Sequence, residues 1–271
     1  MTPGASVGTE EVGTLGELID RVTPEHPDQE TGRWRDTGVY RGSPTAPRRL
    51  LTSLDRLGGE NPAHTKRELE GHILRNFARY SRPHFPAPPT NDWELLVAAQ
   101  HHGVPTRLLD WTYSPFVAAH FATLPYRVHG EERDRAVWRL DWQALHRKFG
   151  LPELALLITD LERELGGPTP FTPWRMFEGR TDREFACMLE PPSLDARIVA
   201  QAAVFTLCTD TSRPFDAFLE EHGLAAALTR FVIPAAHVSR IRDQLDMVAI
   251  DERRLFPDLD GLAAELRRYY S

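Results

Sequence analysis

Gly103 and the pair Ser114-Pro115 divide residues 100–122 into three elements. A glycine is common just after a helix end because it adopts left-handed backbone angles without strain. Serine before proline is typical of an N-cap followed by the first residue of a new helix. Between these points, residues 104–109 predict a short buried strand. Polar side chains at the ends of such packed elements are held rigidly, so this segment predicts one wall of a ligand site.

Short strands and helices alternate irregularly along the rest of the chain. This order predicts a mixed α+β fold with helices around a sheet, rather than a regular doubly wound sheet. Residues 1–14 contain Gly, Thr and Ser without apolar periodicity and predict a flexible leader, and residues 15–271 predict a single domain. The expected strands include 38–42, 135–140, 184–189, 201–207 and 228–233, and the expected helices include 15–22, 65–80, 152–165, 235–245 and 259–269.

Composition restricts the function classes. The net charge of −7 means that the chain as a whole lacks the positive field for non-specific nucleic-acid binding, although a local basic groove stays open as an alternative. Cys187 and Cys208 belong to no Cys-x-x-Cys pair, so neither a disulfide framework nor a thiolate zinc site is expected. The sequence shows no signal peptide and no apolar run long enough to cross a bilayer, which predicts a cytoplasmic protein without a membrane partner.

Several metal-competent side chains crowd the central segment, namely His101, His102, Asp110 and His120. Adjacent histidines on a helix point about 100° apart and rarely bind one ion together. No His-x-x-x-His pattern occurs, so no metal site is expected. His102 remains a candidate base or hydrogen-bonding residue, and His120 is expected in the core or behind the site. Nucleophile elbows and glycine-rich phosphate loops are also missing from the sequence.

Arg41 and Arg107 each lie at the end of an expected strand. A guanidinium binds phosphate or carboxylate with two parallel hydrogen bonds and stays charged when partly buried. The alternative for either arginine is a structural ion pair, for example with Asp110. Asp110 itself is predicted either to orient an arginine or to act as a base.

Several motifs resemble the FRG domain family. They are Tyr40-Arg41-Gly42, residues 51–56, Gln-His-His-Gly and Pro-Thr-Arg-Leu-Leu-Asp-Trp-Thr within residues 93–122, residues 201–205 and residues 255–262. A weaker resemblance connects the chain to ADP-ribosyltransferases of the Arg, Ser-Thr-Ser, Glu type. That resemblance implies a split central sheet with surrounding helices and NAD as substrate.

The resemblance to ADP-ribosyltransferases also implies residue roles. Arg41 would hold an NAD phosphate or ribose, Thr112 would support the nicotinamide pocket, and Gln201 would occupy the position of the catalytic Glu. Because an amide carries no negative charge, activity would then need another carboxylate, with Glu184 and Asp110 as candidates. The implied catalytic residues are Arg41, His102, Asp110 and Gln201, and the implied cofactor-binding residues are Tyr40, Arg41, Gly42, Thr106, Arg107 and Thr112.

The resemblance therefore implies an NAD-dependent ADP-ribosyltransferase, a glycosyltransferase that modifies a protein or nucleic acid. Bacterial toxin or defence systems, with an antitoxin-like partner, are the implied setting. Two alternatives stay open: a non-catalytic nucleotide or nucleic-acid binding module, and an NAD glycohydrolase with water as acceptor.

Overall fold

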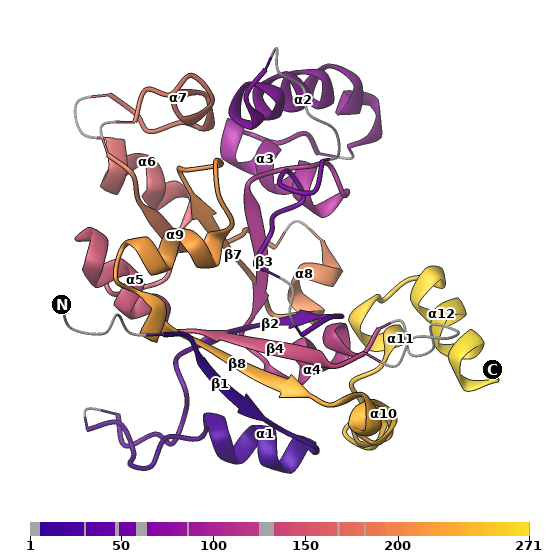
Figure 1. Ribbon diagram of the computed structural model, residues 1–271. Helices are drawn as coiled ribbons and strands as arrows, with labels where there is room; N and C mark the ends of the chain where they lie inside the picture. Colours follow the sequence, from indigo (N-terminus) through magenta and orange to yellow (C-terminus); the bar gives the residue numbers. More distant parts are fainter. Residues whose placement is uncertain are drawn as a thin grey trace.

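The computed structural model describes residues 6–29, 31–46, 49–57, 64–85, 87–124, 133–166, 169–181, 183–193 and 195–270. They form a mixed α/β fold around one eight-stranded sheet of order β1-β8-β4-β2-β3-β7-β6-β5, which confirms the expected class (Figure 1). The β1/β8 and β5/β6 pairs are parallel and the others antiparallel. The strands are β1 (Gly8–Glu11), β2 (Val39–Ser43), β3 (Leu108–Thr112), β4 (Arg135–Leu140), β5 (Leu156–Leu157), β6 (Ala186–Glu190), β7 (Ala203–Cys208) and β8 (Leu228–Ile233).

Helices surround this sheet. Side-chain caps fix many of their starts: Ser114 accepts a hydrogen bond from Val117 N–H, and Asn91 accepts one from Glu94 N–H. The helices are α1 (Leu15–Val22), α2 (Lys66–Ser81), α3 (Asp92–His101), α4 (Pro115–Ala122), α5 (Trp142–Phe149), α6 (Ile158–Gly166), α7 (Pro173–Phe177), α8 (Ala196–Ala200), α9 (Phe215–Glu221), α10 (Val238–Met247), α11 (Glu252–Leu255) and α12 (Leu259–Tyr269). Among the described residues, no helix has the length and apolar character needed to cross a membrane.

The sheet bends sharply between β2 and β3. These strands share the register pair Tyr40–Thr112, whereas β2 pairs with β4 from Val39–Leu140 to Ser43–Ala136. Beyond Tyr40–Thr112 the strands diverge, and in Figure 1 β3 runs steeply across the direction of β2 and β4. Where the strands separate, Arg41-Gly42 on one and Asp110-Trp111 on the other line a gap that forms part of one cavity.

Glycine at position 42 allows α4 to pack directly on β2. A Cβ atom there would lie 2.2 Å from the Ala118 carbonyl oxygen and 2.4 Å from the Ala122 nitrogen. Tyr40 shares this face of the strand and packs in a core cluster with α1, α4 and α10. Because side chains alternate along a strand, Arg41 points to the opposite face.

Several expected boundaries are wrong. Residues 8–11 form β1, paired with β8 from Gly8–Thr229 to Glu11–Val232, so this part of the expected leader is an edge strand. Its sequence Gly-Thr-Glu-Glu has no apolar alternation that would predict a strand. Backbone hydrogen bonds, which do not depend on apolar side chains, hold it in the sheet. The expected strand 104–109 begins only at Leu108, and the expected helix 152–165 begins only at Ile158, after the short β5.

Candidate functional site

A cavity of about 360 Å³ lies at the bend of the sheet, within the size range of small-molecule sites. Strands β2, β3 and β7 form its floor, and α3, α4, α8 and the end of α11 contribute its walls. Aromatic rings and two arginines dominate the lining. The principal side chains are Arg41, Gln100, His101, Asp110, Trp111, Thr112, Phe121, Arg197, Gln201, Phe205 and Phe256.

Arg41 and Asp110 face each other across the gap between β2 and β3. Arg41 Nη1 lies 3.5 Å from Asp110 Oδ2 and donates a hydrogen bond to the Asp110 carbonyl oxygen. The Asp110 side chain is 55% exposed, so its carboxylate is accessible to a ligand even with Arg41 beside it. The expected alternative of an Arg41–Asp110 pair is therefore present, but it lies inside an open cavity.

Gln100 fixes the orientation of the Asp110 carboxylate. Its Nε2 donates to Asp110 Oδ1 at 2.8 Å, while its Oε1 accepts from Thr106 Oγ1 at 2.6 Å. Thr106 N–H in turn donates to Ser53 Oγ at 3.0 Å. Thr106 thus supports the site from behind Gln100 and does not line the cavity.

Tyr40 and Gly42, the other cofactor-binding candidates on β2, have structural roles at the edge of the cavity. The buried Tyr40 hydroxyl donates to Asp36, which also pairs with Arg139, so the phenol is part of a structural network. Burial and the Asp36 carboxylate raise the pKa of Tyr40. Gly42, also an implied cofactor-binding residue, allows α4 to pack on β2, so packing alone accounts for a glycine at this position.

Thr112 and Gln201 meet at the end of β3. Thr112 Oγ1 donates to the Gln201 carbonyl at 2.7 Å, and Gln201 Nε2 donates to the Leu255 carbonyl at 3.0 Å. Gln201 is the C-cap of α8, so the expectation that it begins a strand is wrong; β7 starts at Ala203. The residue lines the cavity while its amide nitrogen anchors α11.

The C-terminal segment closes one side of the cavity. The Phe256 ring contacts Phe121 edge-to-face, with ring centroids 6.0 Å apart, and the Arg197 guanidinium lies 5.6 Å from the Phe256 centroid. Arg197 also pairs with Asp258, which caps α12. The sequence assigned no role to Arg197, Phe121 or Phe256, although Phe256 belongs to one of the motifs that resemble the FRG domain.

Buried charges anchor this C-terminal segment to the body of the protein. Glu252 of α11 lies 3.2 Å from Arg242 Nη2 of α10 and 2.8 Å from Arg268 Nε of α12. The three helices are therefore held together by one carboxylate that is almost entirely buried. Phe256 and the Leu255 carbonyl are placed at the cavity by this arrangement.

The two histidines at the end of α3 differ in their relation to the cavity. His101 lines it and lies 3.3 Å from Asp195 Oδ2, whereas His102 lies outside the lining. Partial shielding from water lowers the pKa of His102, and neighbouring His101 acts in the same direction. The neutral form of His102 is thus favoured near neutral pH, but contact with a ligand in this cavity falls to His101.

Arg107 lies in the core rather than at the cavity. Its Nε donates to Glu70 Oε2 at 2.6 Å and its backbone N–H donates to Glu70 Oε1 at 2.7 Å, with both side chains 1% exposed. The alternative of a structural ion pair therefore describes Arg107, with Glu70 as its partner.

His120 is also buried away from the cavity, where Arg242 Nη1 lies 2.8 Å from its Nδ1. Burial lowers the pKa of His120 to about 3, and the Arg242 charge adds to the effect. The described part of the chain contains no group of three or more His, Cys, Asp or Glu side chains arranged to hold a metal ion.

Comparison with protein families gives a match to the central part of the chain. The model of the FRG domain matches residues 36–131, which confirms the expected resemblance over the stretch that contains β2, α2, α3, β3 and α4. No curated protein and no solved structure matches the chain.

Proposed function

Starting from the FRG domain of residues 36–131 and the cavity that it shares with the C-terminal half of the chain, we propose that the protein is an NAD-dependent ADP-ribosyltransferase. The proposal is carried by the juxtaposition of Arg41 and the exposed carboxylate of Asp110 in an aromatic cavity. Thr112 and Gln201, two further residues named by the resemblance, line the same cavity. Such a fold would be the ADP-ribosyltransferase-like split sheet that the resemblance implies.

The aromatic walls suit the flat rings of a dinucleotide. Phe121, Phe205 and Phe256 provide apolar surface, and base–aromatic stacking contributes about 1–3 kcal/mol per base. Arg41 and Arg197 supply the positive charge that a pyrophosphate requires. These groups offer the main binding features of NAD without a glycine-rich phosphate loop.

Asp110 is the carboxylate best placed for the chemistry. Cleavage of the bond between ribose C1′ and nicotinamide sends the electron pair to nicotinamide and leaves positive charge on the ribose. The Asp110 carboxylate would stabilise that charge and accept the proton of the attacking nucleophile as its bond to C1′ forms. The other candidate, Glu184, pairs with Arg213 at 3.4 Å and does not line the cavity.

Removing the negative charge should affect Asp110 and Glu184 differently. Asp110→Asn keeps the hydrogen bond from Gln100 geometrically possible but removes the negative charge, so nicotinamide release from NAD is expected to fall about a hundredfold or more. Glu184→Gln is the matched control and should release nicotinamide at the wild-type rate. Equal activity of Asp110→Asn and the wild type would refute the assigned role of Asp110.

Labelled NAD distinguishes the proposed transferase from the alternative glycohydrolase. A glycohydrolase leaves free ADP-ribose, whereas a transferase leaves label on a macromolecule. The non-catalytic module is favoured by the anchoring of the Gln201 amide to Leu255, because Gln201 then contributes structure rather than chemistry. Binding of NAD without any nicotinamide release would establish that alternative.

A further inference from the structure

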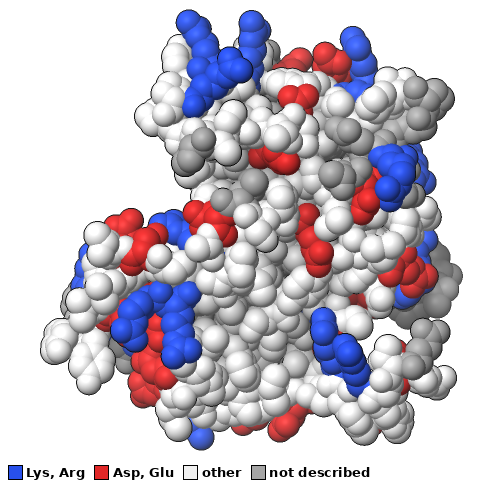
Figure 2. All heavy atoms as spheres, turned by 180° about the vertical axis from the view of Figure 1, so that it is seen from behind, with Lys and Arg blue, Asp and Glu red and all other residues white. Residues whose placement is uncertain are grey.

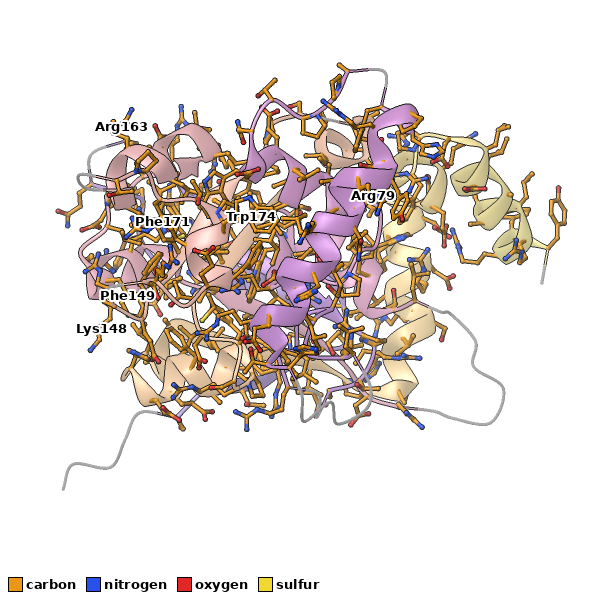
Figure 3. The ribbon with its side chains drawn as sticks, turned by 90° about the horizontal axis from the view of Figure 1, so that it is seen from above. Arg79, Lys148, Phe149, Arg163, Phe171 and Trp174 are labelled. Carbon is orange, nitrogen blue, oxygen red and sulfur yellow. The ribbon has the colours of Figure 1, made fainter. Side chains whose placement is uncertain are left out.

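A basic surface lies on the solvent side of α2, made of His72, Arg75 and Arg79 on the helix and Arg82 directly after it. These residues are exposed and recur at the spacing of one helix face. In Figure 2 basic side chains gather at the top of the molecule, above α2, and Figure 3 shows Arg79 on this helix. The concentration is notable in a chain whose net charge is −7.

The charges of this basic surface are not neutralised locally. Within the described residues, Arg75, Arg79 and Arg82 form no ion pair, whereas many arginines elsewhere have a carboxylate partner, as Arg197 has Asp258. The acidic residues of α2 are otherwise engaged. Glu68 belongs to the capping box at the start of the helix, and Glu70 is buried against Arg107.

Aromatic groups and a second cavity accompany the basic surface. Tyr80 is 64% exposed, and the Arg79 guanidinium lies 5.1 Å from its ring centroid. A cavity of about 260 Å³ beside the end of α2 is lined by Arg82, Phe85, Pro88 and Asp92 among others. An exposed ring among cations that have no carboxylate partner is the kind of surface that binds single-stranded nucleic acid.

A row of rings connects this surface to the first cavity. The Phe85 and His102 ring centroids are 6.2 Å apart, the His102 and His101 centroids are 5.2 Å apart, and His101 lines the cavity of Arg41 and Asp110. A strand bound along the end of α2 would thus pass the mouth of that cavity.

We propose that the basic surface of α2 binds single-stranded nucleic acid, and that this strand is the acceptor of the transferase. The acceptor role rests on the proposed function, whereas the binding does not. A nitrogen or oxygen of the strand would form the bond to ribose C1′ as the bond to nicotinamide breaks. Nicotinamide leaves with the electron pair, and Asp110 takes the proton of the nucleophile.

The test measures binding first, without NAD. A fluorescent single-stranded DNA and an RNA of mixed sequence are titrated with the full chain, and anisotropy is followed at several salt concentrations. In the triple variant Arg75→Glu/Arg79→Glu/Arg82→Glu, affinity should fall at least about tenfold, and the salt dependence of log K should weaken by about 2, since each phosphate contact on a single strand contributes about 0.7. The matched control Arg33→Glu/Arg240→Glu/Arg267→Glu reverses three exposed arginines elsewhere and should bind as the wild type does.

Tyr80→Ala supplies a second, uncharged variant, for which a loss of about tenfold is expected from the missing stacking. Circular dichroism and thermal melting check that each variant is folded. Failure of the wild type to bind either oligonucleotide, equal losses in both triple variants, or preference for a poly-glutamate or phosphopeptide probe would overturn the proposal.

Labelled NAD then tests the acceptor role. Transfer of label to the oligonucleotide should be lost in the α2 triple variant, while water, as the remaining nucleophile, still releases nicotinamide and leaves free ADP-ribose. Binding without any nicotinamide release would refute the proposed function but leave nucleic-acid binding established. Nicotinamide release with label only on protein would refute the acceptor role.

Discussion

Arg41 and Arg107 lie in similar sequence settings but have opposite surroundings. The Arg41 side chain is 19% exposed beside an accessible carboxylate, whereas Arg107 and Glu70 are each 1% exposed and bonded at 2.6 Å. Burial raises the pKa of Glu70, and the Arg107 charge counteracts that effect. The two residues therefore need each other, since either one alone would be an uncompensated buried group.

Replacing Arg107 should consequently cost more stability than replacing a surface arginine. Arg107→Met retains the apolar stem and is expected to lower the free energy of unfolding by about 3–5 kcal/mol, measured by urea denaturation. Arg163→Met is the control, because Arg163 is 70% exposed and lies at the edge of the molecule (Figure 3), so a loss below about 1 kcal/mol is expected. The double variant Arg107→Met/Glu70→Leu should recover most of the loss, and no recovery would contradict this account of the pair.

At the scale of elements, the contact between α11 and α12 determines where Phe256 lies. Gly261 is buried in the first turn of α12, and a Cβ atom there would lie 1.9 Å from the Phe256 carbonyl oxygen and 2.8 Å from the Glu252 carbonyl oxygen. The two helices can approach this closely only because position 261 has no side chain.

Gly261→Ala is therefore expected to push α12 away from α11 and lower stability by about 1–3 kcal/mol despite the higher helix propensity of alanine. NAD binding should weaken as well, because Phe256 loses its support. Gly16→Ala in α1 is the matched control: the added methyl group meets only Thr14 Oγ1, at 3.8 Å, and should stabilise the helix slightly. Scanning calorimetry measures the stability of both variants, and titration calorimetry measures their NAD binding. A stabilised Gly261→Ala protein would show that the contact between α11 and α12 is not tight.

For the whole molecule, two buried histidines contribute to the response to acid. Burial lowers the pKa of His120 to about 3 and also lowers the pKa of His146, whose Nε2 accepts a hydrogen bond from Met188 N–H at 2.8 Å. In the unfolded chain both titrate near the ordinary value of about 6.5. Below that pH the unfolded state binds more protons than the folded state, so stability is lost as the pH falls.

The free energy of unfolding should accordingly decrease from about pH 6.5 downward, by up to about 1.4 kcal/mol per pH unit for each histidine. Urea unfolding between pH 7 and 5 measures the slope. His120→Gln should flatten it, whatever its effect on absolute stability, while the exposed His84→Gln should leave it unchanged. An unaltered slope in His120→Gln would mean that His120 does not titrate as its burial implies.

The sequence predicted elements with local signals better than it predicted contacts. The bounds of α1, β4, β8 and α12 match because capping residues and periodicity lie within each segment. Edge strand β1 was missed because its pairing with β8 depends on residues more than two hundred positions away. Dependence on distant residues also explains what was missed at the site. Motifs in the sequence identified Arg41, Asp110, Thr112 and Gln201. The Glu70 partner of Arg107 and the Arg197–Phe256 contact arise only from tertiary packing.

The bend between β2 and β3 has a thermodynamic consequence for any anion that enters the cavity. Part of the hydrogen-bonding capacity of the Arg41 guanidinium is already used by the Asp110 carbonyl. An incoming phosphate that draws Nη1 away therefore replaces the carbonyl and the nearby carboxylate of Asp110, and only the difference in interaction free energy contributes to affinity. The carbonyl released by that exchange is left beside the ligand, where a sugar hydroxyl can donate to it. Binding of a phosphate to Arg41 would thus free the Asp110 carbonyl to accept a hydrogen bond that orients the ribose.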